Sequence, residues 1–194
     1  MFEEPIRTSN RGVWPLVAVS SALLFVLSSA VSQTAPVERV TGKDKTIVVH
    51  ERGRDHIYDF EEDLRLREIG EARLLFQNRV NGKLYLLIYV VESAGTGNGQ
   101  CGGGQEEYLI WQVLDSEWAQ DDHKVELIGS CALNIENQSP GPDPYEIKQG
   151  KLTSEYIDYP DNFVRRTRTL TYDSTKPEQS WIIQKKPLPA NEPR

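Results

Sequence analysis

The sequence predicts a mainly β protein, either an antiparallel sandwich, a barrel or one strongly curved sheet with about eight or nine strands. Three observations lead to this prediction. Short segments rich in β-branched and aromatic residues recur along the chain, turns containing glycine, proline or asparagine separate them, and no repeat of fixed period indicates a propeller or a solenoid. At most one short helix is expected within the domain, after an N-terminal signal or anchor helix.

The N-terminal segment differs in composition from the rest of the chain. After Arg11, residues 12–37 carry no charge, and their apolar centre spans residues 16–27. This centre is shorter than the roughly 20 residues that cross a bilayer comfortably, and the small residues after it have the spacing of a cleavage site. Two interpretations stay open: residues 1–32 are a cleaved signal peptide, or an uncleaved anchor that crosses a membrane through residues 13–31. A buried core helix is the weakest alternative.

Both leading interpretations place a single domain, residues 33–186, outside the cytosol, either periplasmic or secreted, with a flexible proline-rich tail at residues 187–194. The chain has 22 Lys and Arg against 29 Asp and Glu, a net charge of −7. This charge repels phosphate backbones, so no nucleic-acid partner is expected. A basic protein partner would suit the acidic domain, although solubility alone explains the same charge.

The two cysteines, Cys101 and Cys131, form an even pair in an exported domain, which predicts a disulfide. Closing the loop between them would stabilise the fold by roughly 3–4 kcal/mol. No metal is expected, because two isolated cysteines and the scattered His50, His56 and His123 lack ligand spacing.

The best helix candidate spans residues 59–70. Asp59 can cap it, Glu62 completes a capping box and Gly70 can end it. The alternation of Leu64 and Leu66 supports a strand instead, so both alternatives stay open.

The clearest local structure is a hairpin of residues 74–80 and 83–91, because Asn81 and Gly82 favour a type I′ turn. Its second strand is apolar on both faces and is therefore expected in the centre of a sheet. One face carries Leu84, Leu86, Ile88 and Val90, and the other Tyr85, Leu87, Tyr89 and Val91.

The other expected strands follow the same turn and β-branching signals. A second hairpin turns at Gln149 and Gly150. The expected strands outside the first hairpin are residues 46–50, 108–114, 125–135, 145–148, 151–159, 164–172 and 181–184.

The glycine-rich segment 95–104 is the most unusual in the chain. Gly97, Gly99 and Gly102 satisfy a G-x-G-x-x-G spacing, but a strand follows where a dinucleotide site needs a helix, so no cofactor is expected. The glycines serve either a long hairpin loop or a recognition loop that contacts a partner. The candidate binding residues are Gly97, Asn98, Gly99, Gln100, Gly102, Gly103 and Glu106.

Catalytic residues cannot be assigned, because the spacing selects no pair among the carboxylates. Trp111 and Trp118 are expected in the core or its rim rather than in a ligand groove. The carboxylates considered are Glu106, Glu107, Asp121, Asp122, Asp158 and Asp161.

The function expected from these features is binding of a macromolecular partner, with enzymatic activity left uncertain. An inhibitor, immunity or accessory protein of a cell envelope is the specific expectation, by analogy of architecture alone. An envelope enzyme such as a carbohydrate-active hydrolase and a structural subunit of an envelope complex are the alternatives.

Overall fold

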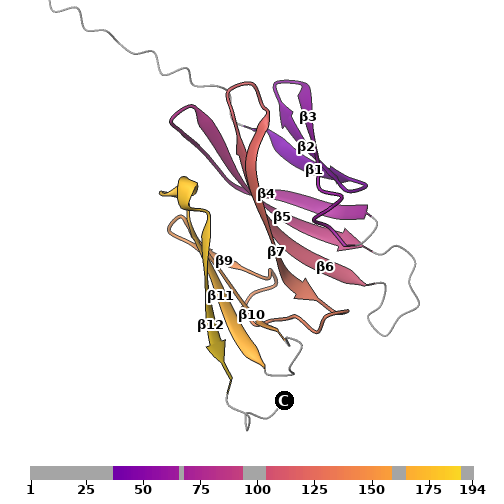
Figure 1. The fold of residues 1–194 in the computed structure, drawn as a ribbon, viewed down its shortest axis with the longest axis vertical. Coiled ribbons are helices and arrows are strands. Elements are labelled where there is room, and N and C mark those ends of the chain that lie inside the picture. Colours follow the sequence, from indigo (N-terminus) through magenta and orange to yellow (C-terminus); the bar gives the residue numbers. More distant parts are fainter. Residues whose placement is uncertain (1–36, 66–67, 94–103, 159–164, 189–194) are drawn as a thin grey trace, which may run out of the picture. The chain divides into compact units, whose positions relative to one another are not determined.

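The computed structural model describes residues 37–65, 68–93, 104–158 and 165–188, most of which lie in antiparallel strands (Figure 1). The prediction of a mainly β fold is confirmed. The described residues form twelve strands in three sheets, and the sequence pattern does not indicate β1, β3 or β8. The strands are β1 (Arg39–Lys43), β2 (Thr46–Glu51), β3 (Arg54–Asp59), β4 (Glu68–Val80), β5 (Lys83–Ser93), β6 (Gln105–Leu114), β7 (Gln120–Ser130), β8 (Glu136–Asn137), β9 (Glu146–Lys148), β10 (Lys151–Asp158), β11 (Arg166–Asp173) and β12 (Trp181–Pro187).

The four-stranded sheet has the order β4-β5-β6-β7, so β5 is an inner strand, as its apolar faces predict. Asn81 and Gly82 join β4 to β5 with φ angles of 51° and 80°, the positive values that a type I′ turn requires. Gln149 and Gly150 make the β9–β10 hairpin in the same way, with φ angles of 50° and 76°. Both predicted hairpins are confirmed.

Two separate cores lie against the two faces of β5. Leu86, Ile88 and Val90 pack in one core with residues of the β1-β2-β3 sheet, such as Ile47 and Val49. The side chains that alternate with them point the other way and pack with β10 and β11. This second core includes Tyr85, Leu87, Tyr89, Leu152, Tyr156, Leu170 and Tyr172. The four-stranded sheet is therefore covered on both sides by sheet.

The β1-β2-β3 sheet is a meander whose turns contain residues at positive φ. Asp44 has a φ of 52° between β1 and β2, and Arg52 and Gly53 have φ angles of 46° and 73° between β2 and β3. The meander joins the four-stranded sheet through β4, because the backbone N–H of Ile69 donates to the carbonyl of Asp44 at 2.6 Å.

No helix occurs among the described residues of the predicted segment 59–70, so that prediction is wrong. Asp59 does accept a backbone N–H, from Glu61 at 2.8 Å, but it stabilises a turn rather than a helix N-terminus. The turn buries Phe60 and Leu64 in the first core. Gly70 lies inside β4. This single turn is enough to bury both side chains, and from Glu68 onward the backbone pairs with β5.

The five-stranded sheet has the path β12-β11-β10-β8, with β9 also pairing with β10. Trp111 of β6 donates its indole N–H to the carbonyl of Pro177 at 2.8 Å, in the short 3-10 helix η1 (Pro177–Gln179). Strand β12 continues to Pro187, which pairs with Arg166, so the last strand extends into the predicted tail.

A cluster of polar side chains also links the four-stranded sheet to the five-stranded sheet. The Tyr156 hydroxyl donates to Glu126 Oε1 of β7 at 2.5 Å, and Arg168 Nη1 lies 3.3 Å from the same oxygen. The Arg168 guanidinium also contacts Asp158. Burial, and then the hydrogen bond to Glu126, raise the pKa of Tyr156, so its hydroxyl stays protonated and donates.

All the described residues belong to one compact unit, Thr34–Arg194. Within the described part of the chain, no helix has both the length and the apolarity to cross a membrane.

Candidate functional site

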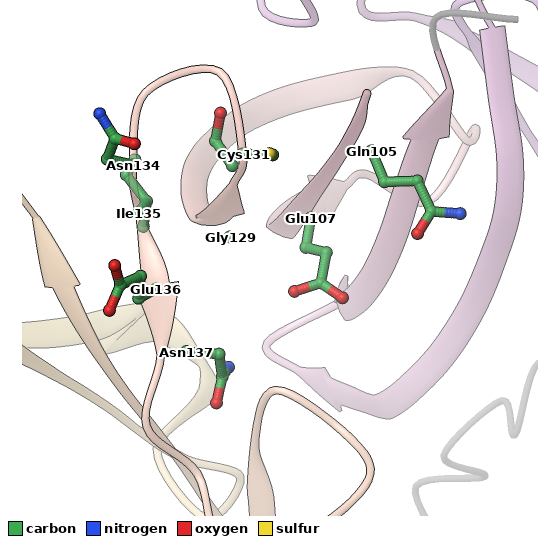
Figure 2. Close-up of a pocket in the computed structure, with 9 residues that line it drawn as sticks. Gln105, Glu107, Gly129, Cys131, Asn134, Ile135, Glu136 and Asn137 are labelled. Carbon is green, nitrogen blue, oxygen red and sulfur yellow. The ribbon is translucent and has the colours of Figure 1, made fainter. Parts of the chain in front are cut away.

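A pocket of about 380 Å³ lies where β6 begins and β7 ends. Figure 2 shows Asn134, Ile135 and Glu136 along one wall, Glu107 and Gln105 on the other, and Gly129 between them. Most of the lining side chains are polar. The lining residues are Gln105, Glu107, Gly129, Ser130, Cys131, Asn134, Ile135, Glu136 and Asn137.

One wall of the pocket is a tight turn after β7. Ser130 and Ile135 pair through two backbone hydrogen bonds of 2.8 and 3.1 Å, and Asn134 takes a φ of 52°, which asparagine tolerates better than most residues. The Ser130 hydroxyl accepts the backbone N–H of Leu133 at 3.1 Å. A continuous strand over residues 125–135 is therefore not formed, and Cys131 lies in the turn rather than in a strand.

Glu107 is held in the pocket by two neighbours. The Tyr89 hydroxyl donates to Glu107 Oε1 at 3.0 Å. Gly129 is the cross-strand partner of Glu107, and a Cβ at Gly129 would lie only 2.3 Å from Glu107 Oε2. Because a glycine leaves this space free, the carboxylate can lie across the β7 backbone.

Burial and the neighbouring Arg73 guanidinium hold Tyr89 in place. Burial, and then the charge of Glu107, raise the pKa of Tyr89, so its hydroxyl remains a donor to the carboxylate. The Arg73 guanidinium lies 4.7 Å from the centre of the Tyr89 ring and binds Glu71 Oε1 at 2.6 Å and Asp143 Oδ1 at 2.8 Å. The ring is thus packed between the core and a paired cation.

The pocket is rich in hydrogen-bond acceptors and contains no lysine or arginine among its lining residues. Among the residues that the structure describes, neither Glu107 nor Glu136 has an ion-pair partner. Asn137 is already fixed: its Nδ2 donates to the Pro144 carbonyl at 2.7 Å, and its Oδ1 accepts the Ser139 N–H at 2.6 Å. The pocket therefore presents the Glu107 carboxylate without a described cation, whereas the side chain of Glu136, which borders the pocket, points away from Glu107 (Figure 2).

Glu106, predicted as a contact of the glycine-rich segment, lies in β6 and is only 2% exposed. Tyr108 and Ser130 donate to its two carboxylate oxygens at 2.6 and 3.0 Å. Glu92 of β5 lies directly opposite and is fully buried, with one oxygen bound by the Arg65 backbone N–H at 3.1 Å. The structure thus brings Glu92 and Glu106 together, a pair that their spacing in the sequence does not indicate. Both are buried, so neither is accessible to a substrate.

The other predicted binding residues, Gly97, Asn98, Gly99, Gln100, Gly102 and Gly103, lie outside the described residues, as does Cys101. The ends of this segment are described. Ser93 pairs with Gln105 where the chain leaves β5 and enters β6, and Gln105 lines the pocket. Cys131 also lines the pocket and is not a free thiol. Its predicted pairing with Cys101 stays a prediction.

Most of the remaining candidate residues have structural partners. Trp111 is 4% exposed and packs in the second core, and Trp118 stacks on His56 with ring centres 4.1 Å apart. His123 binds Asp63 at 3.0 Å, and Asp121 binds Lys83 at 2.5 Å. Asp158 contacts Arg168, the backbone N–H of His123 donates to Asp122, and Asp161 lies outside the described residues.

Two pocket residues carry signals that the sequence offered. Glu107 was one of six carboxylates without a selected partner, and Gly129 interrupts the apolar strand pattern after Ile128. An isolated glycine in a strand often marks a close approach of another group, here the Glu107 side chain.

No protein-family model matches the chain, and neither a curated protein nor a solved structure does. In the described residues, no group of three or more histidine, cysteine, aspartate or glutamate side chains could hold a metal ion. The polar residues that line the pocket carry two carboxylates, three carboxamides and a hydroxyl.

Proposed function

We propose that the chain is an exported β domain that binds a macromolecular partner in the cell envelope, and that the pocket and the adjoining glycine-rich segment form the binding surface. One observation carries this proposal: the Glu107 carboxylate is fixed by Tyr89 in a pocket whose lining residues supply no cation. Holding a charged side chain in place lowers the entropic cost of binding an opposite charge.

Export is proposed from residues 1–32, as a signal peptide or as an anchor. A cleaved chain would be periplasmic or secreted, and an uncleaved one would stay attached through residues 13–31. The intact mass of the protein purified from its own cells reports which form exists. A reporter fused after residue 194 that works only in the cytosol would contradict export.

An inhibitor, an immunity protein or an accessory protein of the envelope is the proposed role. A carbohydrate-active hydrolase is the second candidate, for which Glu107 in the pocket would supply one carboxylate. A structural subunit of an envelope complex remains a third. Glu107→Gln separates the first two, since a hydrolase would lose turnover of envelope polysaccharide, whereas a binding protein has no turnover to lose.

The test of partner binding is co-purification from an envelope extract, comparing the wild-type chain with an Asn98→Ala/Gln100→Ala variant. We expect a stoichiometric partner whose affinity falls by about 1–2 kcal/mol in the variant if these side chains are near the interface centre. We expect the stability to change by no more than about 0.5 kcal/mol.

Gln184→Ala is the matched control, because Gln184 is exposed on β12 in the five-stranded sheet. Its variant should bind the partner like the wild type. If the Asn98→Ala/Gln100→Ala variant also binds equally well, the segment is not a recognition element. If no partner is recovered, the proposed function is contradicted.

A further inference from the structure

We propose that Thr41, His50 and Asp55 form an acyl-transfer site on the outer face of the β1-β2-β3 sheet, with Thr41 as the nucleophile. The substrate is an ester with an apolar acyl chain. This activity goes beyond the proposed function, and the site shares no residue with the pocket. The hydrogen bonds, the strand register and the side chains around Thr41 support it.

Two hydrogen bonds join the three side chains in a line. His50 Nδ1 lies 2.6 Å from Asp55 Oδ1, and His50 Nε2 lies 2.9 Å from the Thr41 hydroxyl oxygen. An ionised carboxylate can only accept, so Nδ1 carries the proton shared with Asp55. In the neutral imidazole Nε2 then accepts, and the Thr41 hydroxyl donates to it. A hydroxyl bonded to a base that a carboxylate orients is the arrangement of an activated nucleophile.

The register of the three strands places these side chains together (Figure 1). Alternate side chains of β1, β2 and β3 enter the first core, and the others face outward. His50 pairs with Asp55 of β3 on one side and with Arg39 of β1 on the other. Thr41 follows Arg39 by two residues, so it lies diagonally from His50 on the same face. Backbone pairing within one sheet therefore holds the three groups in position.

The site is open, and an apolar row adjoins it. The Asp55 side chain is 58% exposed, and Thr41 and His50 are partly exposed. Val48 pairs with Thr41, and Ile57 pairs with Val48 on the next strand. Ile57 is 67% exposed, so its side chain can gain contacts when a ligand covers it. An acyl chain lying along this row would place its carbonyl group at Thr41.

Two cations flank the hydroxyl on β1. Arg39 and Lys43 lie two residues before and after Thr41, so they share its face at a distance of roughly 7 Å along the strand. Both are exposed, and neither forms an ion pair within the part of the chain that the structure describes. Their long side chains can reach the carbonyl oxygen of an ester at Thr41. A lysine or arginine there stabilises the negative charge that develops on this oxygen.

The reaction proceeds through an acyl-threonine. Thr41 Oγ1 attacks the carbonyl carbon of the ester, and His50 Nε2 accepts the hydroxyl proton. The bond between this carbon and the alcohol oxygen then breaks, and the alcohol leaves with the bonding electron pair and the proton from His50. Water attacks the acyl group in the same way, with His50 as the base, which releases the carboxylic acid and restores the Thr41 hydroxyl.

The experiment follows p-nitrophenolate release from p-nitrophenyl hexanoate by the purified full-length protein, and peptide mass spectrometry then locates the acyl group. We expect the acyl group on Thr41. Thr41→Val replaces the hydroxyl by a methyl group and should lower the rate by about tenfold or more, whereas Thr41→Ser should stay active. Asp55→Asn should also lower the rate by about tenfold or more, because it no longer fixes the tautomer of His50.

His123→Gln is the matched control for hydrolysis by an imidazole alone. His123 also binds an aspartate, Asp63, at 3.0 Å, but its other ring nitrogen faces the Gln120 amide instead of a hydroxyl. This variant should hydrolyse the ester at the wild-type rate, whereas His50→Gln should lose about tenfold or more. Ile57→Ser should raise KM for the hexanoate ester and leave KM for p-nitrophenyl acetate unchanged, because an acetyl group is too short to reach Ile57.

Equal rates for wild type and Thr41→Val, with equal stability in urea, would overturn the proposal. No release above the rate in buffer, or an acyl group found on Lys43 or His50 instead of Thr41, would also overturn it. If Thr41→Val fails to fold, the location of the acyl group and the rate of His50→Gln decide the question. Acylation at Thr41 that is lost in His50→Gln supports the proposal, whether or not a partner co-purifies.

Discussion

Gly42→Ala should strongly destabilise the domain, because β1 packs against β4 at this residue. A Cβ at Gly42 would lie 2.0 Å from Ile69 Cγ2 and 2.5 Å from Ile69 Cβ. Carbon atoms in ordinary contact are about 3.5–4.0 Å apart, so the strands would have to separate by roughly 1.5 Å. Ile69 is buried and branched at Cβ, so it cannot rotate out of the way.

The expected cost has two parts. Overpacking a core typically costs about 1–3 kcal/mol, and separating the strands also weakens the Ile69 N–H to Asp44 carbonyl hydrogen bond, worth roughly 0.5–1.5 kcal/mol. Together they predict a loss of about 2–4 kcal/mol. For a domain of this size the melting temperature should fall by roughly 4–16 °C.

Urea unfolding followed by tryptophan fluorescence measures the loss directly. Gly70→Ala is the control, because a Cβ at Gly70 would have its nearest neighbour, the Val91 carbonyl oxygen, at 3.8 Å. This variant should be as stable as the wild type, or slightly more stable through a less flexible unfolded chain. If Gly42→Ala were also as stable as the wild type, the packing of β1 on β4 would be refuted.

Three further predictions concern titration, the link between sheets and the disulfide. Burial raises the pKa of Tyr145 and Tyr172 to about 12, above the ordinary value of 10. Near pH 10 only the unfolded chain ionises these tyrosines, so their contribution to the free energy of unfolding is complete below pH 10 and is lost as the pH rises toward 12. Absorbance at 295 nm follows their ionisation, and urea unfolding follows the stability. If both tyrosines titrate at the ordinary value, their burial is contradicted. Arg168→Met leaves its two carboxylate partners without a cation and should cost on the order of 2 kcal/mol, whereas an unchanged urea midpoint would show that the link contributes nothing. Cys101 and Cys131 should not react with a thiol reagent in unreduced, denatured protein from its native compartment, and full reaction of both would reject the disulfide.

The sequence contains enough information to predict the core of the central sheet. Side chains of β5 alternate between two apolar sets, and the structure places each set in its own core. This works because a strand with two apolar faces can be stable only between two other layers. The turn residues Asn81 and Gly82 fix the hairpin locally, independently of distant packing.

The N-terminal meander and the segment after it were harder to predict. Strands β1 and β3 contain many charged residues, and only their packing on the first core makes them strands. Asp59 has the local signal of a helix cap, and the same hydrogen-bonding ability makes a turn when the next segment pairs with β5. Tertiary pairing therefore overrides a local preference here.

The candidate site shows a more specific limit. Glu106 and Glu107 are neighbours, but alternation along a strand sends them to opposite faces. Glu106 lies on the same face as Tyr108 and is buried, whereas Glu107 reaches the pocket. Extending the predicted strand 108–114 by two residues toward the N-terminus places Glu106 on the same face as Tyr108, and so identifies Glu106 as the buried carboxylate. The pocket itself could not be predicted, because the turn at residues 131–134 brings its second wall into place.

The most direct test of partner binding at this pocket is the affinity of a co-purified partner for three chains: wild type, Glu107→Gln and Glu155→Gln, measured by isothermal titration calorimetry. Removing the pocket charge should weaken binding by about 1.4 kcal/mol or more, a tenfold change, while Glu155→Gln should bind like the wild type. Equal affinities for all three chains, with each variant as stable as the wild type, would contradict a binding role for the pocket.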